Sequence, residues 1–113
     1  MPCVFCLLVA GQAPAEVLYS DDQVVAFRDL RPRAPVHFLV VPHRHIESAA
    51  DLSEADAPVL SHMFAVARKV AEQEGILGSG YRLVFNVGAN AGQSVDHLHL
   101  HVLGGRHLAW PPG

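Results

Sequence analysis

The stretch Gly92–Arg106, GQSVDHLHLHVLGGR, decides both the fold and the chemistry expected of this 113-residue chain. His97, His99 and His101 occupy alternate positions and are separated by apolar residues. Side chains of a β-strand alternate between the two faces of a sheet. A strand here would therefore place the three imidazole rings on one face and the intervening leucine and valine side chains in the core.

The three histidines are open to three interpretations. Exposed histidines can decorate a strand without a function, but strict alternation beside Gly92, Gln93 and Ser94 makes this the weakest interpretation. Residues i and i+2 of a strand can also both reach one zinc ion. Alternatively, a neutral imidazole attacks phosphorus near neutral pH, and a second imidazole donates a proton to the leaving group. The Gly-Gln-Ser turn then offers N–H groups and a hydroxyl to the phosphate oxygens.

The rest of the chain contains further strand patterns. β-type runs at 16–19 and 23–29 flank a turn at 20–22 and predict a hairpin. Residues 37–41, HFLVV, predict a central strand ended by a proline, and 81–87, YRLVFNV, predict another strand. The histidine segment itself would be the next strand.

One helix is expected over residues 53–74. Ser53 and Asp56 resemble a capping box, and Gly75 is placed to end the helix. The apolar residues that recur at helical spacing are Val59, Leu60, Met63, Phe64, Ala67, Val70 and Ala71. Strands interrupted by one strong helix indicate an α+β domain with a mostly antiparallel sheet. Without a repeat or a linker, residues 1–113 read as a single domain.

Composition excludes several classes of partner. The net charge of −3 gives no basic stripe of the kind that DNA or RNA binding usually needs. No apolar run approaches the roughly 18 residues that span a bilayer, and the first residues lack the basic segment of a signal peptide. We therefore expect a cytoplasmic protein without a nucleic-acid or membrane partner.

Two cysteines, Cys3 and Cys6, stand in a C-x-x-C arrangement. In a chain without a secretion signal this spacing indicates metal binding or redox chemistry. Only two residues precede Cys3, whereas a thioredoxin-like motif lies between a strand and a helix. Zinc is the better interpretation, and two of the eight histidines would have to complete its ligands.

The run His97-Leu-His99-Leu-His101-Val-Leu resembles the motif of the histidine triad hydrolases and transferases. The resemblance extends over most of the chain and includes CVFC at 3–6, VVAFRDLRPRAPVHFLVVPHRHI at 24–46, FNVGANAGQSVDHLHLHVLGG at 85–105 and GGRHLAWPPG at 104–113. The last segment is similar to the ending of the Hint branch, whose members are histidine triad nucleotide-binding proteins that cleave purine nucleoside phosphoramidates.

This resemblance implies a fold and an assembly. The fold is a five-stranded antiparallel sheet with one long helix and a short N-terminal helix. Two copies form a homodimer in which the sheets join into one continuous sheet of ten strands.

The resemblance also implies roles at the phosphate. His99 would be the nucleophile that forms a covalent nucleotidyl-histidine, and His101 would contact the phosphate and assist the leaving group. Ser94 would hydrogen-bond the departing nitrogen, and His37 would lie behind the triad and fix its rings. The backbone of Gln93 and Ser94 would hold the phosphate oxygens, and Gly92 in the same turn would belong to the nucleotide site.

The nucleoside would occupy residues of several segments. Asp29 matches a carboxylate that accepts hydrogen bonds from the ribose hydroxyls, although it could be a turn residue at a strand end. Asn86 matches a residue near the phosphate and ribose, and Trp110 matches a tryptophan that reaches the site of the partner subunit or anchors the interface. The apolar wall around the purine, which could equally be ordinary core, comprises Val4, Phe5, Leu8, Phe27 and Leu30.

Family members that begin with C-x-x-C bind zinc through four positions. In this sequence these are Cys3, Cys6, His45 and His97, a Cys₂His₂ set typical of closed structural sites. His97 would then be structural.

The function implied is hydrolysis of the P–N bond of purine nucleoside phosphoramidates, which releases AMP or GMP. A dinucleoside polyphosphate hydrolase of the same fold is an alternative that the WPPG ending disfavours. A nucleotide-binding scaffold with little turnover is the other alternative, and the presence of all three triad histidines with Ser94 weighs against it.

Overall fold

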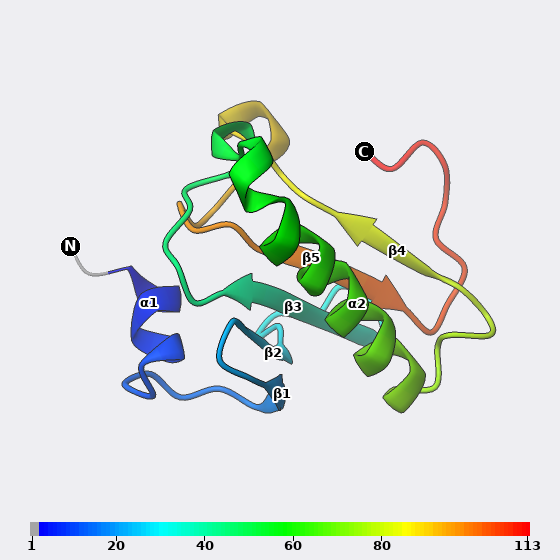
Figure 1. Ribbon diagram of the computed structural model, residues 1–113. Coiled ribbons are helices and arrows are strands. Elements are labelled where there is room, and N and C mark those ends of the chain that lie inside the picture. The colour runs from blue at the N-terminus through cyan, green and yellow to red at the C-terminus, as the bar shows by residue number, and fades with distance from the viewer. Residues whose placement is uncertain (1–2) are drawn as a thin grey trace.

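A five-stranded antiparallel sheet organises the computed structural model, which describes residues 3–113 (Figure 1). The strands lie in the order β1-β2-β3-β5-β4. In chain order the helices and strands are α1 (Val4–Val9), β1 (Val17–Ser20), β2 (Val24–Arg28), β3 (Val36–Pro42), α2 (Ala57–Gln73), β4 (Tyr81–Val84) and β5 (Leu100–Gly104). Three short 3₁₀ turns lie at Ala49–Asp51, Glu54–Asp56 and Ala89–Ala91. The expected sheet, long helix and short N-terminal helix are confirmed.

Strand β3 lies at the centre of the sheet, and every residue of it after Val36 is buried. It pairs with β2 on one side and with β5 on the other. Leu39 lies opposite His101 in this ladder, and Val40 lies opposite Leu100. The β3–β5 pair therefore carries core residues on one face and the triad on the other.

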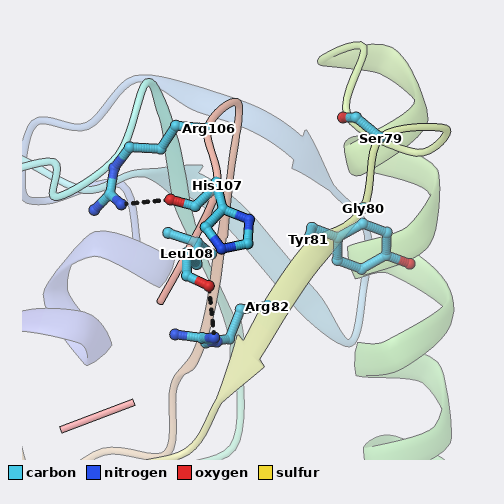
Figure 2. A pocket seen from close by; sticks show the side chains of 7 residues that line it. All are labelled: Ser79, Gly80, Tyr81, Arg82, Arg106, His107 and Leu108. Carbon is cyan, nitrogen blue, oxygen red and sulfur yellow. Dashed lines mark hydrogen bonds between the residues drawn. The ribbon is translucent and has the colours of Figure 1, made fainter. Parts of the chain in front are cut away.

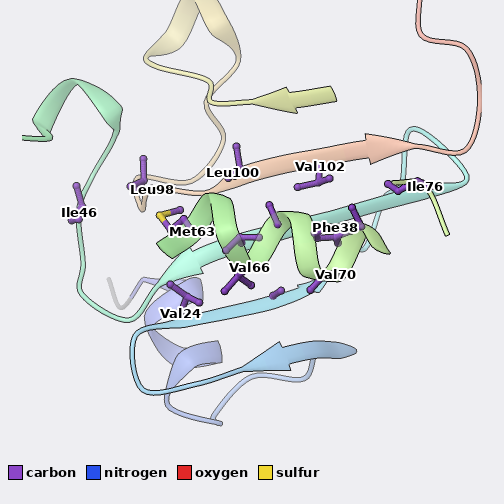
Figure 3. Packing of buried hydrophobic residues seen from close by; sticks show 14 residues of the cluster. Val24, Phe38, Ile46, Met63, Val66, Val70, Ile76, Leu98, Leu100 and Val102 are labelled. Carbon is purple, nitrogen blue, oxygen red and sulfur yellow. The ribbon is translucent and has the colours of Figure 1, made fainter. Parts of the chain in front are cut away.

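Helix α2 covers one face of the sheet (Figures 1 and 3). The expected capping box is present, with the Ser53 N–H donating to Asp56 Oδ2 at 2.9 Å. The first turn after it is 3₁₀, and the α-helix ends at Gln73, just before Gly75 with its positive φ of 77°. Residues from the helix and the sheet together form the larger core, whose main members are Val24, Phe38, Met63, Val66, Val70, Leu98, Leu100 and Val102.

One residue of the expected apolar helix face lies elsewhere. Phe64 is 39% exposed, whereas Val66 is buried in its place. The Phe64 ring packs edge-on against Phe85, with ring centroids 6.0 Å apart, beside the edge strand β4. Helix α2 therefore presents an aromatic side chain toward the free edge of the sheet.

The opposite face of the sheet carries a second, smaller apolar cluster under helix α1. Its buried members are Phe5, Val25, Phe27, Leu39 and Val41. The rings of Phe5 and Phe27 meet edge-to-face with centroids 5.5 Å apart. This short helix is held by tertiary packing, since six residues are too few to be stable alone.

The histidine strand is shorter than expected, because β5 begins only at Leu100 and β4 ends at Val84. His97 and His99 precede the ladder, where the N–H of Leu98 pairs with the carbonyl of Ile46. The alternation still holds, since Leu98, Leu100 and Val102 are all buried in the core under α2.

Two glycines end β5 where neighbouring chain approaches closely. A Cβ on Gly104 would lie 2.8 Å from Ile76 Cδ1, and a Cβ on Gly105 would lie 2.9 Å from Pro35 Cβ. Gly105 also has a φ of +90°, a conformation that side chains disfavour. Within residues 3–113, no helix has the length and apolarity needed to cross a membrane. A cytoplasmic location stays a prediction.

Candidate active site

The three triad rings lie on the sheet face opposite α2, next to helix α1. His97 and His99 are buried, and His101 is half-buried. The ring centroids of His99 and His101 are 4.9 Å apart, and Phe5 packs edge-on against both His97 and His99. The prediction that the three imidazoles share one face is confirmed.

A main-chain hydrogen bond determines which nitrogen of His99 is free. His99 Nδ1 lies 2.7 Å from the carbonyl oxygen of His97. A carbonyl only accepts, so Nδ1 carries the proton and Nε2 keeps its lone pair. A neutral imidazole with a free lone pair is a nucleophile, and Nε2 would be the attacking atom.

A second set of hydrogen bonds orients His101. The N–H of Arg33 donates to His37 Nδ1 at 3.0 Å, so the proton of His37 sits on Nε2. His37 Nε2 then donates to His101 Nδ1 at 3.0 Å. The proton of His101 is left on Nε2, where it can reach a bound group. Asp29 Oδ2 lies 3.5 Å from His37 Nε2 and faces the same pair.

Both members of this pair are neutral at pH 7. Burial lowers the pKa of His101 to about 4, with the neighbouring His99 and His37 acting in the same direction and Asp29 opposing them. Burial also lowers the pKa of His37, which Arg33 reinforces and Asp29 opposes. The chain of hydrogen bonds from Arg33 through His37 to His101 requires one proton on each ring, and therefore two neutral rings.

Four side chains beside the triad form a candidate metal cluster. The ligand atoms of Cys3, Cys6, His45 and His97 all lie within 4.8 Å of one another. His97 Nδ1 is 3.3 Å from Cys3 Sγ and 3.5 Å from Cys6 Sγ, and His45 Nδ1 is 3.3 Å from Cys6 Sγ. The four predicted ligands therefore come together, although they derive from three separate segments.

The donor set of this cluster fits zinc. His97 Nε2 donates to the carbonyl of Pro42 at 2.9 Å, which leaves the lone pair of Nδ1 facing the two thiols. A ligating histidine usually has its other nitrogen fixed by such a bond. Burial is also the main factor that lowers the pKa of His97, so the ring is neutral, as a metal ligand must be.

The residues predicted to hold the nucleoside divide into buried and exposed groups. Phe5 and Phe27 are core members of the cluster under α1, and Leu8 is half-buried against them. Val4 is 47% exposed and Leu30 is 89% exposed. Neither belongs to the packed cluster around Phe5 and Phe27, so only the buried part of the expected apolar wall comes together. Asp29 follows directly after β2.

The turn before the triad is held mainly by Gln93. Its side-chain oxygen accepts from the N–H of Gly88 at 2.9 Å, and its amide nitrogen donates to the carbonyl of Glu47 at 2.8 Å. The backbone N–H of Gln93 donates to Gly88, and that of Gly92 donates to Ala89. The N–H of Gln93, which is expected to contact phosphate, therefore has a main-chain partner, and so does that of Gly92. The Ser94 side chain is exposed.

Comparisons with known proteins agree with this geometry. The family model described as "Scavenger mRNA decapping enzyme C-term binding" matches residues 2–109. A purine nucleoside phosphoramidase of Escherichia coli strain K12 is 44% identical over 105 residues, which cover 93% of this chain and 88% of the relative. An uncharacterised HIT-like protein of Synechococcus elongatus is 44% identical over 110 residues, which cover 97% of this chain and 96% of the relative.

The crystal structure of a HIT family hydrolase from Legionella pneumophila Philadelphia 1 superposes with a TM-score of 0.97. It is 46% identical, and the match covers 99% of this chain and 100% of that chain. The chain belongs to the histidine triad family. The resemblance inferred from the triad, the N-terminal cysteines and the WPPG ending is thereby confirmed.

A groove of about 810 Å³ lies beside the last triad histidine, His101, whereas His97, His99 and Ser94 are not among the residues that line it. His37, His101, Asn86 and Trp110 all line it, so four predicted residues share one space. Trp110 is 81% exposed in the C-terminal tail, which runs beside β4 (Figure 1). Asp29 and the apolar residues around Phe5 are not among the residues that line this groove.

Three arginines that the sequence did not single out also line the groove. They are Arg33, Arg82 and Arg106. Figure 2 shows the last two beside residues 107 and 108 of the tail, in a smaller adjoining pocket of about 340 Å³. They come from a loop, a strand and the tail, so no local pattern marks them as a group.

The low pKa of His101 predicts a specific pH dependence of stability. Because its folded pKa of about 4 lies below the ordinary value of 6.5, the unfolded chain binds this proton more readily. The contribution of His101 to the free energy of unfolding is complete above pH 6.5 and is lost as the pH falls toward 4. The maximum change is roughly 3 kcal/mol.

Urea unfolding at several pH values measures this effect. We expect the free energy of unfolding of His101→Asn to fall less between pH 6.5 and 4 than that of the wild type. The control His107→Asn changes an exposed histidine, and its free energy of unfolding should depend on pH as that of the wild type does. If the free energy of unfolding of His101→Asn fell as steeply with pH as that of the wild type, His101 would not be the buried neutral group described above.

Proposed function

We propose that this histidine triad protein hydrolyses purine nucleoside phosphoramidates, cleaving the P–N bond and releasing AMP or GMP. The observation that carries the proposal is the pairing of a free Nε2 on His99 with a proton on Nε2 of His101. The relative from Escherichia coli is named a purine nucleoside phosphoramidase, and the structure from Legionella is a HIT family hydrolase. Both names are consistent with a nucleotide hydrolase.

In the first step, the lone pair of His99 Nε2 attacks phosphorus. A bond forms between phosphorus and Nε2, the original P–N bond breaks, and its electron pair leaves with the amine, which takes up one proton. The negative charge of the bound phosphoryl group favours protonation of the nearby His101 ring. The protonated ring then gives its Nε2 proton to the amine and is left neutral. The product is a nucleotidyl-His99 intermediate.

In the second step, water attacks the phosphorus of the intermediate. The P–N bond to His99 breaks, its Nε2 regains the lone pair, and the proton released by water returns through His101. The nucleoside monophosphate then leaves. Exchange of one P–N bond for another in the first step avoids a steep rise in energy, which favours phosphoramidates over substrates with a P–O bond.

Other residues position the substrate in this scheme. His37 fixes the ring of His101. Ser94, whose side chain is exposed, would hydrogen-bond the departing nitrogen through its hydroxyl. Asp29 would accept hydrogen bonds from the ribose hydroxyls. The exposed side chains of Val4 and Leu30 would cover the purine beside Phe5.

Replacing the nucleophile tests the catalytic proposal. With adenosine 5′-phosphoramidate as substrate, we expect the wild type to release AMP and His99→Ala to lose roughly 10³-fold or more of kcat. His43→Ala is a matched control, because His43 belongs neither to the triad nor to the metal cluster. Chromatography of the nucleotide products measures the rate.

Three results would contradict the proposal. Full turnover by His99→Ala would exclude this nucleophile. Faster cleavage of diadenosine tetraphosphate than of the phosphoramidate would favour a dinucleoside polyphosphate hydrolase. Nucleotide binding without turnover by the wild type would favour a scaffold.

We also propose that Cys3, Cys6, His45 and His97 hold one structural zinc ion. The four ligand atoms lie within 4.8 Å of one another, and a Cys₂His₂ set forms closed tetrahedral sites. When bound, zinc would supply cross-linking energy and no step of the reaction. It would connect the first turn of α1 to the chain that enters β5.

Metal analysis tests the zinc proposal. We expect about one zinc per chain in the purified wild type, as one closed four-ligand site requires. Cys3→Ala should lose the metal, because it removes one of the four ligands, whereas His43→Ala should retain it. Equal zinc content in both variants would show that the cysteines do not bind it.

We further propose that two copies pair through β4 into a ten-stranded sheet. β4 is an edge strand, and Leu83, Phe64 and Val87 beside this edge are 39%, 39% and 43% exposed. An unpaired edge with apolar neighbours is a template for another strand. Trp110, in the tail that passes this edge, would then lie near the partner subunit.

The two edges of the sheet provide a matched test of the dimer. Leu83→Lys introduces a charge on β4, whereas Val17→Lys introduces one on β1, where Val17 is 51% exposed. By sedimentation equilibrium we expect a dimer for the wild type and Val17→Lys, and a monomer for Leu83→Lys. A monomeric wild type, or a dimer broken only by Val17→Lys, would contradict this interface.

A further inference from the structure

One main-chain N–H in the loop between β2 and β3 sets the proton positions of two site histidines. The N–H of Arg33 donates to His37 Nδ1 at 3.0 Å, and His37 Nε2 donates to His101 Nδ1 at 3.0 Å. A neutral imidazole has one N–H and one acceptor nitrogen, so each bond settles the tautomer of the next ring. The proton on His101 Nε2 therefore depends on where the N–H of Arg33 points.

The loop that carries this N–H is fixed at its start by main-chain donors. The N–H of Asp29 donates to the carbonyl of His37 at 3.0 Å, and the N–H of Arg31 donates to Asp29 Oδ1 at 2.8 Å. Pro32 and Pro35 have no N–H to donate. The second half of the loop, which includes Arg33, therefore depends on bonds to its carbonyl groups.

The side chain of Arg106 supplies such a bond from beyond the end of β5. Its Nη2 donates to the carbonyl of Arg33 at 2.8 Å, and its Nη1 donates to the carbonyl of His107 at 3.0 Å, which Figure 2 shows. The N–H and the carbonyl of Arg33 are thus held from two sides, by His37 and by Arg106. A rigid planar guanidinium with several donors is suited to such a bridge.

The β3–β5 ladder explains why Arg106 reaches this loop. Val36 lies opposite Gly104 in the ladder, so the chain that follows β5 runs beside the chain that precedes β3. A Cβ on Gly105 would lie 2.9 Å from Pro35 Cβ, and the φ of Gly105 is +90°. Glycine alone readily permits this close approach and this conformation. It brings Arg106 against the loop.

We propose that Arg106 is a positioning residue of the reaction and acts through Arg33 and His37 on His101. It holds the loop so that the proton of His101 stays on Nε2, the atom that gives a proton to the departing amine. Arg106 itself contacts neither the substrate nor the reacting atoms. This inference rests on the proposed function, because it concerns a proton of the same reaction, and it leaves the steps at phosphorus unchanged.

The tautomers of the site histidines test this role without turnover. In Arg106→Gln, the N–H of Arg33 is no longer held toward His37, so either nitrogen of that ring can carry the proton. Two-bond ¹⁵N–¹H correlation spectra at pH 7 should then show mixed tautomers for His37 and His101. His99 should keep its proton on Nδ1, because its partner is the carbonyl of His97.

Arg82→Gln is the matched control for these spectra. Arg82 lines the same groove and carries the same charge, but it donates to carbonyls of the C-terminal tail at 3.4 and 3.0 Å. We expect His37 and His101 to keep their protons on Nε2 in this variant. Unchanged tautomers in Arg106→Gln, or the same change in both variants, would overturn the proposal.

Two substrates with different leaving groups test the effect on catalysis. Adenosine 5′-phosphoramidate releases an amine that must take up a proton, whereas adenosine 5′-(p-nitrophenyl phosphate) releases a stable anion that needs none. The value of kcat/KM reports the first step for each. We expect Arg106→Gln to lower it about tenfold for the phosphoramidate, part of the roughly 10²–10⁴ that a general acid contributes, and barely to change it for the ester.

A variant in the same loop is the control for the rates. Arg31→Gln changes a neighbouring side chain but keeps the main-chain bond to Asp29, so both kcat/KM values should stay at the wild-type level. An equal loss on the two substrates in Arg106→Gln would show a general effect on binding or folding and would overturn the role assigned to Arg106.

A double variant tests whether the effect passes through His37. In His37→Gln the ring that connects Arg33 to His101 is gone, so adding Arg106→Gln should lower kcat/KM no further. Losses that multiply would contradict the proposed route. If His37→Gln does not fold, the tautomer spectra of Arg106→Gln still decide the matter.

The outcomes separate this inference from the proposed function. Absence of AMP release from the phosphoramidate by the wild type would overturn the proposed function, while mixed tautomers confined to His37 and His101 in Arg106→Gln would still support the route from Arg106. Wild-type tautomers in Arg106→Gln, together with an active wild type, would overturn this inference alone.

Discussion

The hydrogen bond from His99 Nδ1 to the carbonyl of His97 is the contact on which the site depends. It is 2.7 Å long and leaves the lone pair of His99 on Nε2. The residue that provides this carbonyl is itself fixed, because the His97 ring donates to Pro42 and faces Cys3 and Cys6. Main-chain and side-chain atoms of His97 thus connect the proposed nucleophile, His99, to the candidate metal cluster.

The two faces of the sheet differ in the side chains that they carry. One face packs on α2 and contains the main apolar core, which includes residues of both β3 and β5. The other face carries His37, His99 and His101, with the apolar residues of α1 beside them. Because the strand order places Asp29 and the histidines in sequence across this second face, a nucleotide bound as proposed would extend from β2 toward β5.

Periodicity predicted much of this structure, but contacts between distant segments were beyond its reach. Alternation in the triad predicted the two faces correctly, while the start of β5 at Leu100 depends on a bond between Leu98 and Ile46 that no local pattern reveals. The family motif identified the cysteines and histidines of the metal cluster. The proton positions on the rings could not be predicted, because they follow from the carbonyl of Pro42 and the N–H of Arg33.

Proton positions on the four histidines provide the most direct test of the central claim. Two-bond ¹⁵N–¹H correlation spectra at pH 7 distinguish a proton on Nδ1 from one on Nε2. We predict that His99 carries its proton on Nδ1, whereas His37, His97 and His101 carry theirs on Nε2. A proton on Nε2 of His99 would contradict the account, because the atom assigned to attack phosphorus would have no free lone pair.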